Sequence, residues 1–392
     1  MDGGGVSAVA PGDAKALLRA LVATDSRNPD LVPGAPGEGA IARLLSDVLR
    51  SWGMRVELRD AAPGRPNVIA RVGTPGAGRS LMFNGHIDVV AVDGMAHSPF
   101  DAEVRDGKLY GRGASDMKAG VATMCAAAFR AAAKGLSGEL VVACVVDEEF
   151  KSAGTKALVE SGVRADAAIV TEPTGLTIMP AHRGFTWVTI DCRGRAAHGS
   201  RYDLGVDAIL HASYVMTALA DFEREELTTH THPLLGHASM HAGTITGGAG
   251  WSTYPEACRL EIERRTLPGE STQQVLDEIQ GVCNRVRQRE PSLRATVQYV
   301  FSQLPSDVAV DAPICRALSD ALTIKGETVR VAGMSAWTDA ALLNAAGIPA
   351  ICFGPGDMTL AHANSEWVEL AEVDRACEVL TDLALAWCGA GA

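Results

Sequence analysis

Three apolar runs, far apart in the chain, each stop at side chains that can bind a metal ion. Short continuous apolar runs are typical of buried strands in a parallel sheet. In such sheets, ligands and catalytic groups gather just beyond the carboxyl ends of the strands. The sequence therefore predicts one crevice lined by a histidine and several carboxylates, a ligand set that suits zinc. The runs are residues 81–84, before His86 and Asp88; 140–146, before Asp147, Glu148 and Glu149; and 167–171, before Glu172.

Length and composition are those of a globular protein of about two domains. The chain has 392 residues, of which 47% are hydrophobic, and a domain usually takes ~100–200 residues. The formal net charge of −12 argues against a nucleic-acid partner, which requires clustered Lys and Arg.

The cysteines point to a reducing compartment. All nine are scattered singly, without a Cys-x-x-Cys pair, and that pattern is not a disulfide framework. No uncharged stretch is long enough to span a bilayer, and the first residues show no basic region followed by an apolar segment. We therefore expect a soluble, cytoplasmic protein without a membrane partner.

The pattern of secondary structure changes twice along the chain. Residues 1–181 and 302–392 alternate between strands and helices, which predicts an α/β/α layer sandwich. Residues 182–301 follow the order β-α-β-β-α-β of a ferredoxin-like unit, which predicts a smaller α+β domain inserted into the larger one. The predicted strands are residues 55–59, 67–72, 81–84, 140–146, 167–171, 185–191, 240–246, 259–265, 294–301 and 348–353, and the predicted helices are 12–24, 38–52, 117–134, 154–161, 204–222 and 271–288.

Asp116 and His362 are two further candidate ligands. Asp116 precedes an Ala-rich helix, where the helix dipole stabilises a carboxylate that could bridge two cations. The simpler alternative for Asp116 is a helix cap, and for His362, in a late loop, an ordinary loop histidine. A nucleotide-binding loop is excluded, because the Gly111-x-Gly113 pair lacks the third glycine of that motif.

The charges of the candidate ligands balance two divalent ions. His86, Asp116, Glu149, Glu172 and His362 include three carboxylates, so they carry −3 when both histidines are neutral. Two divalent ions and one hydroxide would bring the centre to neutrality. Without cations, carboxylates this close would raise each other's pKa and protonate. We therefore expect two ions, zinc first, with cobalt or manganese as alternatives.

Together these motifs resemble those of the co-catalytic zinc amidohydrolases and peptidases, a family that includes acetylornithine deacetylase, succinyl-diaminopimelate desuccinylase, aminoacylase and glutamate carboxypeptidase. The resemblance runs from about residue 14 to the end of the chain. It implies that Asp116 bridges the two ions, that His86 and Glu172 complete one site, and that Glu149 and His362 complete the other. The segments that carry it are His86-x-Asp88, residues 113–120, residues 147–149, Thr171-Glu172-Pro173 and Ala361-His362.

The same resemblance implies roles for two more acids. Glu148 would be the general base and acid, and Asp88 the partner of the His86 imidazole. A zinc-bridging hydroxide would attack the amide bond of an N-acyl amino acid, as in acetylornithine deacetylase or succinyl-diaminopimelate desuccinylase. A dipeptidase or a glutamate-type carboxypeptidase is the alternative within the family, and a non-catalytic binder of acyl amino acids is a distant one. A serine hydrolase is excluded, because the chain has no G-x-S-x-G elbow.

The inserted segment resembles the lid and dimerisation domain of this family, which implies a homodimer. His198 would stabilise the oxyanion, often from a neighbouring subunit, and Arg265 would contact the carboxylate of a small substrate, an N-acyl amino acid or a dipeptide. Arg183 would add a second cationic contact. Where the family often has Asn three residues before a lid proline, this chain has Ser252. Without the metal motifs, His198 would be interpreted as a helix cap and Arg265 as a strand-end charge.

Four histidines in the inserted segment raise the question of a second metal site. The segment has the composition of a polar lid loop, and we favour that interpretation over a metal site. The four are His230, His232, His237 and His241.

Overall fold

The computed structural model describes residues 9–389, and its chain divides into two compact units. Unit 1 comprises the chain up to Pro180, Val308–Ala332 and the chain from Thr338; unit 2 comprises Ala181–Asp307 and Gly333–Trp337. The insertion predicted from the sequence, residues 182–301, lies within unit 2. Unit 2 is larger than that prediction, because it continues to Asp307 and includes the short segment Gly333–Trp337.

The main sheet is parallel at its centre and antiparallel toward both of its edges. Seven of its strands are, in spatial order, β1 (Arg55–Ala62), β2 (Arg65–Gly73), β6 (Glu139–Val145), β3 (Leu81–His86), β7 (Ala167–Val170), β17 (Ala350–Cys352) and β8 (Ile178–His182). β3 runs parallel to both β6 and β7, and β17 runs parallel to β7. β1 and β2 form a hairpin that joins β6 antiparallel. The expectation of a parallel sheet is therefore right for the three runs that precede the acids. It is wrong for both edges, since a tight hairpin makes β1 and β2 antiparallel and β8 pairs antiparallel with β17.

Helices cover both faces of this sheet, which explains the continuous apolar runs. All residues of β3, β6 and β7 are buried, and alternate residues such as Leu140 and Val142 join the main hydrophobic core on one face. The helices that contribute to this core are α1 (Ala14–Val22), α2 (Gly39–Ser51), α3 (Ala119–Ala133), α7 (Pro313–Ile324) and α9 (Leu370–Cys388). α4 (Ala153–Glu160) and α8 (Ala340–Ala345) pack against each other and against the strands. This layering confirms the predicted α/β/α class.

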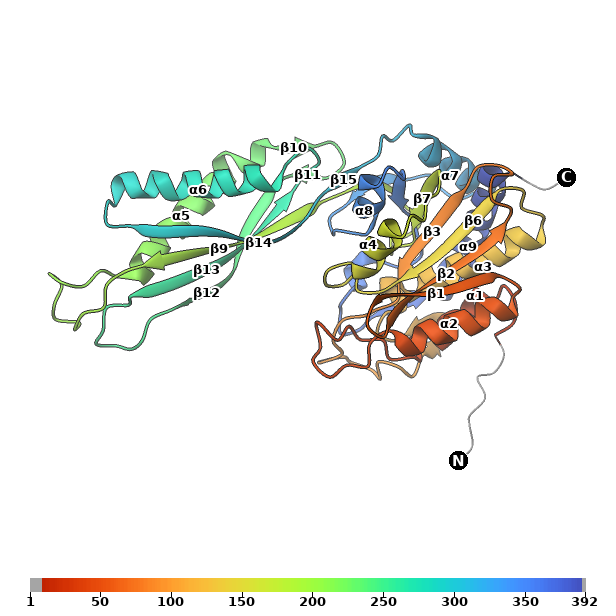
Figure 1. Cartoon of the computed structure of the whole chain (residues 1–392), viewed down its shortest axis with the longest axis horizontal. Coiled ribbons are helices and arrows are strands. Elements are labelled where there is room, and N and C mark those ends of the chain that lie inside the picture. The colour runs from red at the N-terminus through yellow and green to blue at the C-terminus, as the bar shows by residue number, and fades with distance from the viewer. Residues whose placement is uncertain (1–8, 390–392) are drawn as a thin grey trace, which may run out of the picture. The chain divides into compact units, whose positions relative to one another are not determined.

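The Ala-rich helix α3 is almost entirely buried. It packs against α1 and α9 as well as against the sheet (Figure 1). Alanine combines a high helix propensity with a short side chain, so a helix of this composition can pack closely on several sides. The helix thereby holds the segment that precedes it, η1 (Ala114–Lys118), against the carboxyl end of the sheet.

Unit 2 has the predicted ferredoxin-like order. Its elements are β9 (Gly184–Arg193), α5 (Ala208–Glu225), β12 (Ser239–Gly247), β13 (Ala257–Thr266), α6 (Thr272–Arg289) and β14 (Arg294–Gln303). The antiparallel sheet has the order β12-β13-β9-β14, and α5 and α6 lie together on one of its faces (Figure 1). The predicted start of α5 at residue 204 is wrong, because the Asp207 side chain caps the helix by accepting from the Leu210 N–H.

Several short elements have no counterpart in the prediction from sequence. Most are too short to show a periodic pattern. One group, β4, β5 and β18, forms a small separate sheet in unit 1. These elements are β4 (Glu103–Arg105), β5 (Lys108–Tyr110), β10 (Thr231–His232), β11 (Gly236–His237), β15 (Ser306–Asp307), β16 (Val331–Met334), β18 (Trp367–Glu369), η2 (Leu227–Thr229) and η3 (Met358–Leu360).

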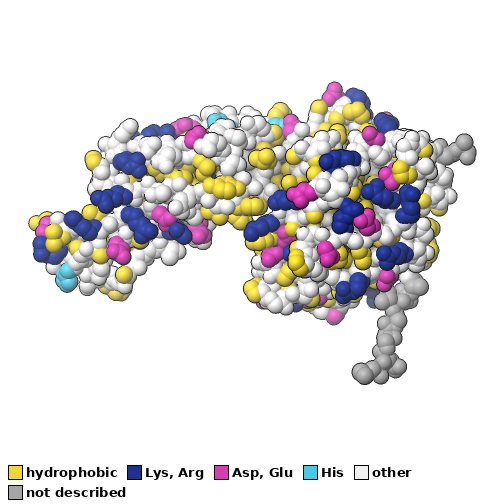
Figure 2. Space-filling view, in the orientation of Figure 1, with side chains coloured by type: hydrophobic (Ala, Val, Ile, Leu, Met, Phe, Trp, Pro, Cys, Tyr) yellow, Lys and Arg dark blue, Asp and Glu magenta, His cyan; other side chains and the backbone are white. Residues whose placement is uncertain are grey.

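The surface has no single sign of charge on the face that Figure 2 displays. Lys and Arg side chains are interspersed there with Asp and Glu side chains. Within residues 9–389, no helix combines the length and the apolar character needed to cross a membrane.

Candidate metal centre

Three parallel strands bring acidic and basic side chains to the carboxyl end of the main sheet. β3 ends at His86, and its neighbours β6 and β7 end just before Asp147 and Glu172. Nε2 of His86 lies 3.9 Å from Oε2 of Glu148. The charge of Glu172 acts on both His86 and Glu149. Side chains that follow the three apolar runs thus lie near one another at the carboxyl ends of these strands.

Asp116 lies between two histidines from distant parts of the chain. Its Oδ1 is 3.1 Å from Nε2 of His86, and its Oδ2 is 3.6 Å from Nε2 of His362. The same His362 nitrogen lies 2.9 Å from Oε2 of Glu149. Each carboxylate oxygen of Asp116 therefore faces a different imidazole.

His362 reaches the centre from a loop that follows η3. Its φ of 61° is left-handed, a conformation that costs of order 1–3 kcal/mol for a residue other than glycine. Its side chain is 54% exposed, whereas that of His86 is 1% exposed. The centre is therefore closed on the His86 side and open on the His362 side.

Asp88 supports both His86 and the pair of acids. Nδ1 of His86 lies 3.0 Å from the backbone oxygen of Asp88 and 3.6 Å from its Oδ1. The Asp88 carboxylate also accepts the backbone N–H groups of Glu148 and Glu149, each at 3.2 Å. Because these bonds fix the backbone of both acids, Asp88 determines where their side chains start.

Asp147, the first of the three consecutive acids, faces away from the candidate ligands. Its carboxylate accepts hydrogen bonds from Asn28 (3.1 Å) and Arg65 (3.1 Å), and caps α4 through the Ala153 N–H. Arg65 in turn forms two hydrogen bonds with buried Glu38. Asn28 and Arg65 were not found from the sequence, because an isolated Asn or Arg outside a motif gives no signal.

Crowding of acids perturbs the pKa values of the candidate ligands and of Glu148. Burial raises the pKa of Glu148 well above its usual value, and the charges of Glu172, Asp339 and Glu149 add to that rise while His86 opposes it. Burial and Asp116 likewise raise the pKa of Glu172 well above the usual range. The raised pKa values show that the negative charge of these carboxylates exceeds the positive charge around them.

The two imidazoles respond in the opposite sense. Burial alone would lower the pKa of His86, but its hydrogen bonds with Asp116 and Asp88 outweigh burial and raise it well above the usual value. The hydrogen bond with Glu149 raises the pKa of His362 to about 9. The raised pKa values favour protonated imidazoles, whose positive charge reduces the repulsion among the carboxylates. Metal cations at the same place would reduce that repulsion as well.

The donor set fits divalent metal ions. Ligand atoms of His86, Asp116 and Glu149 all lie within 4.8 Å of one another. Imidazole nitrogens and carboxylate oxygens, with crowded negative charge, are suited to zinc and similar ions.

The candidate substrate-binding residues of unit 2 form two separate pairs. Arg183 and Arg265 lie near the start of β9, since Arg265 pairs with Phe185, and the charge of Arg265 acts on Arg183. His198 and Ser252 lie beyond the end of β9, where Gly199 N–H donates to the Ser252 oxygen at 2.8 Å.

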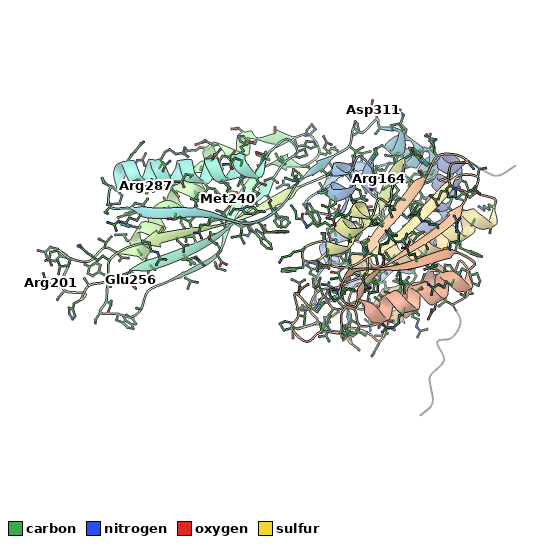
Figure 3. All side chains as sticks on the ribbon, in the orientation of Figure 1. Arg164, Arg201, Met240, Glu256, Arg287 and Asp311 are labelled. Atoms are coloured by element: carbon green, nitrogen blue, oxygen red, sulfur yellow. The ribbon has the colours of Figure 1, made fainter. Side chains whose placement is uncertain are left out.

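The two pairs therefore lie at opposite ends of one sheet. In Figure 3, Arg201 and Glu256 mark the end that holds His198, and Met240, opposite Arg264 in the sheet, marks the other. Ten residues of β9 separate the pairs, which corresponds to roughly 33 Å at about 3.3 Å per residue.

The four histidines of the predicted lid loop, His230, His232, His237 and His241, do not converge on one site. His230 pairs with Glu270 at 3.0 Å and His232 with Asp307 at 3.3 Å. Glu278 lies close enough to join His230 and Glu270, but the Arg264 guanidinium lies 2.6 Å from Glu270 and supplies the positive charge there.

The amino-acid sequence is similar to those of known proteins. The pattern of the Peptidase family M20/M25/M40 matches residues 82–386. An acetylornithine deacetylase from Myxococcus xanthus is 32% identical over 338 residues, which cover 85% of this chain and 87% of that protein. An N-formyl-4-amino-5-aminomethyl-2-methylpyrimidine deformylase from Bacillus subtilis (strain 168) is 30% identical, with 91% of each chain covered.

Solved structures share the fold at lower identity. A tripeptidase from Staphylococcus aureus has a TM-score of 0.81 at 19% identity, covering 97% of this chain and 100% of that chain. A dinuclear metal-binding peptidase of the M20 family from Bacillus subtilis has a TM-score of 0.73 at 19% identity, with 95% and 97% covered.

Proposed function

This chain belongs to the Peptidase family M20/M25/M40 and is a hydrolase, and from that premise we propose that it hydrolyses the amide bond of an N-acyl amino acid. The observation that carries the proposal is the carboxylate of Asp116, whose two oxygens face His86 and His362. That arrangement supports two adjacent cations with Asp116 between them.

The proposed ligand set divides into two halves around Asp116. His86 and Glu172 would hold one ion, and Glu149 and His362 the other. Two zinc ions are the first choice, with cobalt or manganese as alternatives. Divalent ions held by these residues would supply a water of lowered pKa, ~7, and would polarise the substrate carbonyl.

Glu148 is the proposed general base and acid. It lies beside the proposed ligands, with its Oε2 3.9 Å from Nε2 of His86. Its raised pKa, caused by burial and by neighbouring acids, suits a group that first accepts the proton of the attacking water and then donates one to the leaving amine. Asp88 would hold His86 in place and fix the backbone from which Glu148 projects.

Arg265 and Arg183 are the proposed contacts for the substrate carboxylate. Arg183 donates to the Leu235 oxygen, so its guanidinium is anchored. The Arg265 guanidinium lies over the Phe185 ring at 5.4 Å and donates to Glu263. The two positively charged guanidinium groups repel each other. A bound carboxylate would reduce that repulsion, so the pair would bind an anion strongly.

His198 and Ser252 are proposed to act on a second copy of the chain. The length of β9 between them and Arg265 exceeds the span of an acyl amino acid, so one substrate cannot touch both ends of one unit 2. A homodimer would let His198 stabilise the oxyanion in its partner's site.

The outer strand of the unit 2 sheet supports such a dimer. β12 is the terminal strand of that sheet, and most of its residues are exposed, including Ile245 at 52%. A terminal strand of this kind can pair with the same strand of a second copy. Light scattering coupled to size-exclusion chromatography should give twice the chain mass, and Ile245→Lys should reduce it to one chain.

A substrate panel measures the proposed reaction directly. Amine release from N-acetyl, N-succinyl, N-carbamoyl and N-formyl substrates and from dipeptides is compared, with the purified protein loaded with zinc, cobalt or manganese. We expect release from N-acyl amino acids, N-acetylornithine among them, because the M. xanthus relative bears that name. Turnover of dipeptides alone would favour the peptidase alternative, and binding without released amine would contradict hydrolysis.

Chelation tests the metal part independently. Removal of divalent ions should abolish amine release, and zinc, cobalt or manganese should restore it. Activity that survives complete removal of metal would contradict the proposed mechanism.

We further propose that the protein works in the cytoplasm. All nine cysteines are free and buried, as is usual in a reducing compartment.

A further inference from the structure

Two buried residues outside the proposed ligand set connect the segments that carry Asp116 and His362. These residues are Arg112 and Glu366, whose charged groups lie 2.7 Å apart with 3% and 1% of their side chains exposed. Arg112 precedes Asp116 on the approach to η1, and Glu366 follows His362 on the approach to β18. Neither has a role in the proposed reaction.

The Glu366 carboxylate binds the backbone of the turn that ends at Asp116. Its Oε1 accepts the N–H groups of Ser115 (2.9 Å) and Asp116 (3.0 Å). Its Oε2 accepts the Gly113 N–H (3.1 Å) and the Arg112 guanidinium (2.7 Å). One side chain therefore satisfies three backbone donors of a single turn, including that of Asp116 itself.

The Arg112 guanidinium binds the segment that carries His362. Its Nη1 donates to the backbone oxygen of Ala363, directly after His362, at 3.2 Å. Its Nε donates to the Ala91 oxygen at 2.9 Å. The pair thus binds the backbone of Asp116 itself and the backbone of Ala363, the residue next to His362.

Ser115 adds a second connection between the same two segments. Its hydroxyl accepts the Asp357 N–H (3.0 Å) and donates to the Asp357 oxygen (3.1 Å). The turn at Asp116 is therefore fastened to the segment 357–366 at both ends, with His362 between the two fastenings.

We propose that Arg112 and Glu366 are positioning residues, which hold Asp116 and His362 at the separation that two adjacent ions require. His362 needs such support, because its side chain is half exposed and its backbone is left-handed. Without the pair, the loop would relax toward an ordinary conformation and carry the imidazole away from Asp116. This inference rests on the proposed metal centre but not on the identity of the substrate.

The test is metal affinity in Glu366→Gln. Glutamine has the same shape, but its amide nitrogen cannot accept an N–H group, so part of the turn loses its acceptor. Loss of such supporting contacts typically weakens metal binding about 10–100-fold. Isothermal titration with zinc, with metal content measured after dialysis, should therefore show at least one of the two ions bound that much more weakly. Co²⁺ absorption, which reports the coordination geometry, should change as well.

Two further variants complete the experiment. Glu369→Gln changes an exposed acid on the adjoining strand β18 and should bind both ions as the unchanged chain does. Arg112→Lys keeps the positive charge but lacks the planar, forked donor group, so it should also weaken metal binding, and it provides the comparison if Glu366→Gln does not fold.

The outcomes separate this inference from the proposed function. Folded Glu366→Gln or Arg112→Lys that binds two ions with unchanged affinity and an unchanged Co²⁺ spectrum would overturn the positioning role. An unchanged chain that binds no pair of ions would instead overturn the proposed function.

Discussion

Glu148 and Glu149 are neighbours in the chain that face different partners, which makes them a matched pair for mutation. Glu149 lies 2.9 Å from His362 and Glu148 lies 3.9 Å from His86. We expect Glu148→Gln to keep both ions and to lower kcat by about 10²–10⁴-fold, the usual contribution of a general base. Glu149→Gln should lose metal as well as activity. Metal analysis and kinetics on the two variants decide between these roles, and a fully active Glu148→Gln would exclude it as the base.

The buried His182 should make the free energy of unfolding depend on pH. Burial lowers the pKa of His182 from 6.5 to about 4. Between these two pH values, His182 is protonated in the unfolded chain but not in the folded chain. The contribution of His182 to stability is therefore fully present above pH 6.5 and is lost as the pH falls toward 4.

The expected loss from this residue is about 3 kcal/mol. His182→Gln has no such proton to bind, so its free energy of unfolding should fall less than that of the unchanged chain over the same range. Denaturant unfolding at a series of pH values measures the difference, and parallel curves would show that His182 does not titrate in this way.

At the residue scale, the sequence points to the proposed ligands and the proposed base more clearly than to the groups that support them. His86, Glu148 and Glu149 follow apolar strands, and that position could be seen directly. Arg65 and Glu366 are buried by segments far away in the sequence, so only the folded chain reveals their partners. A buried charge gives no local pattern that distinguishes it from a surface charge.

Helix α3 contacts the end of β7 so closely that one glycine is required there. A Cβ on Gly120 would lie 1.8 Å from the backbone oxygen of Thr171, the residue before Glu172. Because a backbone atom cannot swing away, Gly120→Ala should cost about 3 kcal/mol or more.

Gly281 in α6 is the matched control. A Cβ there would meet no atom within 4 Å, so Gly281→Ala should stabilise the chain by about 0.5–1 kcal/mol through its better helix propensity. Thermal unfolding of both variants tests the pair, and equal effects would contradict the close approach of α3 to β7.

At the scale of elements, periodicity predicts most of the long elements and none of the shortest ones. The exceptions among the long helices are α7 and α9, for which the sequence gives no bounds. The strands that precede the acids and the helices α2, α3 and α6 are periodic over several turns or fully apolar, and were predicted to within a few residues. The sheet of β4, β5 and β18 consists of three-residue strands, which are shorter than any repeat. The antiparallel edges of the main sheet depend on which strands pair, and no single segment encodes that.

Metal removal should destabilise the two units unequally. Each unit has its own hydrophobic core, and all proposed ligands belong to unit 1. Ions at about 100 times their Kd should stabilise unit 1 by about 2.7 kcal/mol. Hydrogen exchange with and without zinc should therefore change protection in unit 1 more than in unit 2, and the reverse result would place the ions elsewhere.

The route of the chain through unit 1 has a consequence for its synthesis. His86, Asp116, Glu149 and Glu172 leave the ribosome early, but the loop bearing His362 follows only after the whole of unit 2 has been made. At about 5–20 residues per second, that delay is on the order of tens of seconds. On the proposed ligand set, a nascent polypeptide therefore has no complete metal centre until the loop bearing His362 has emerged.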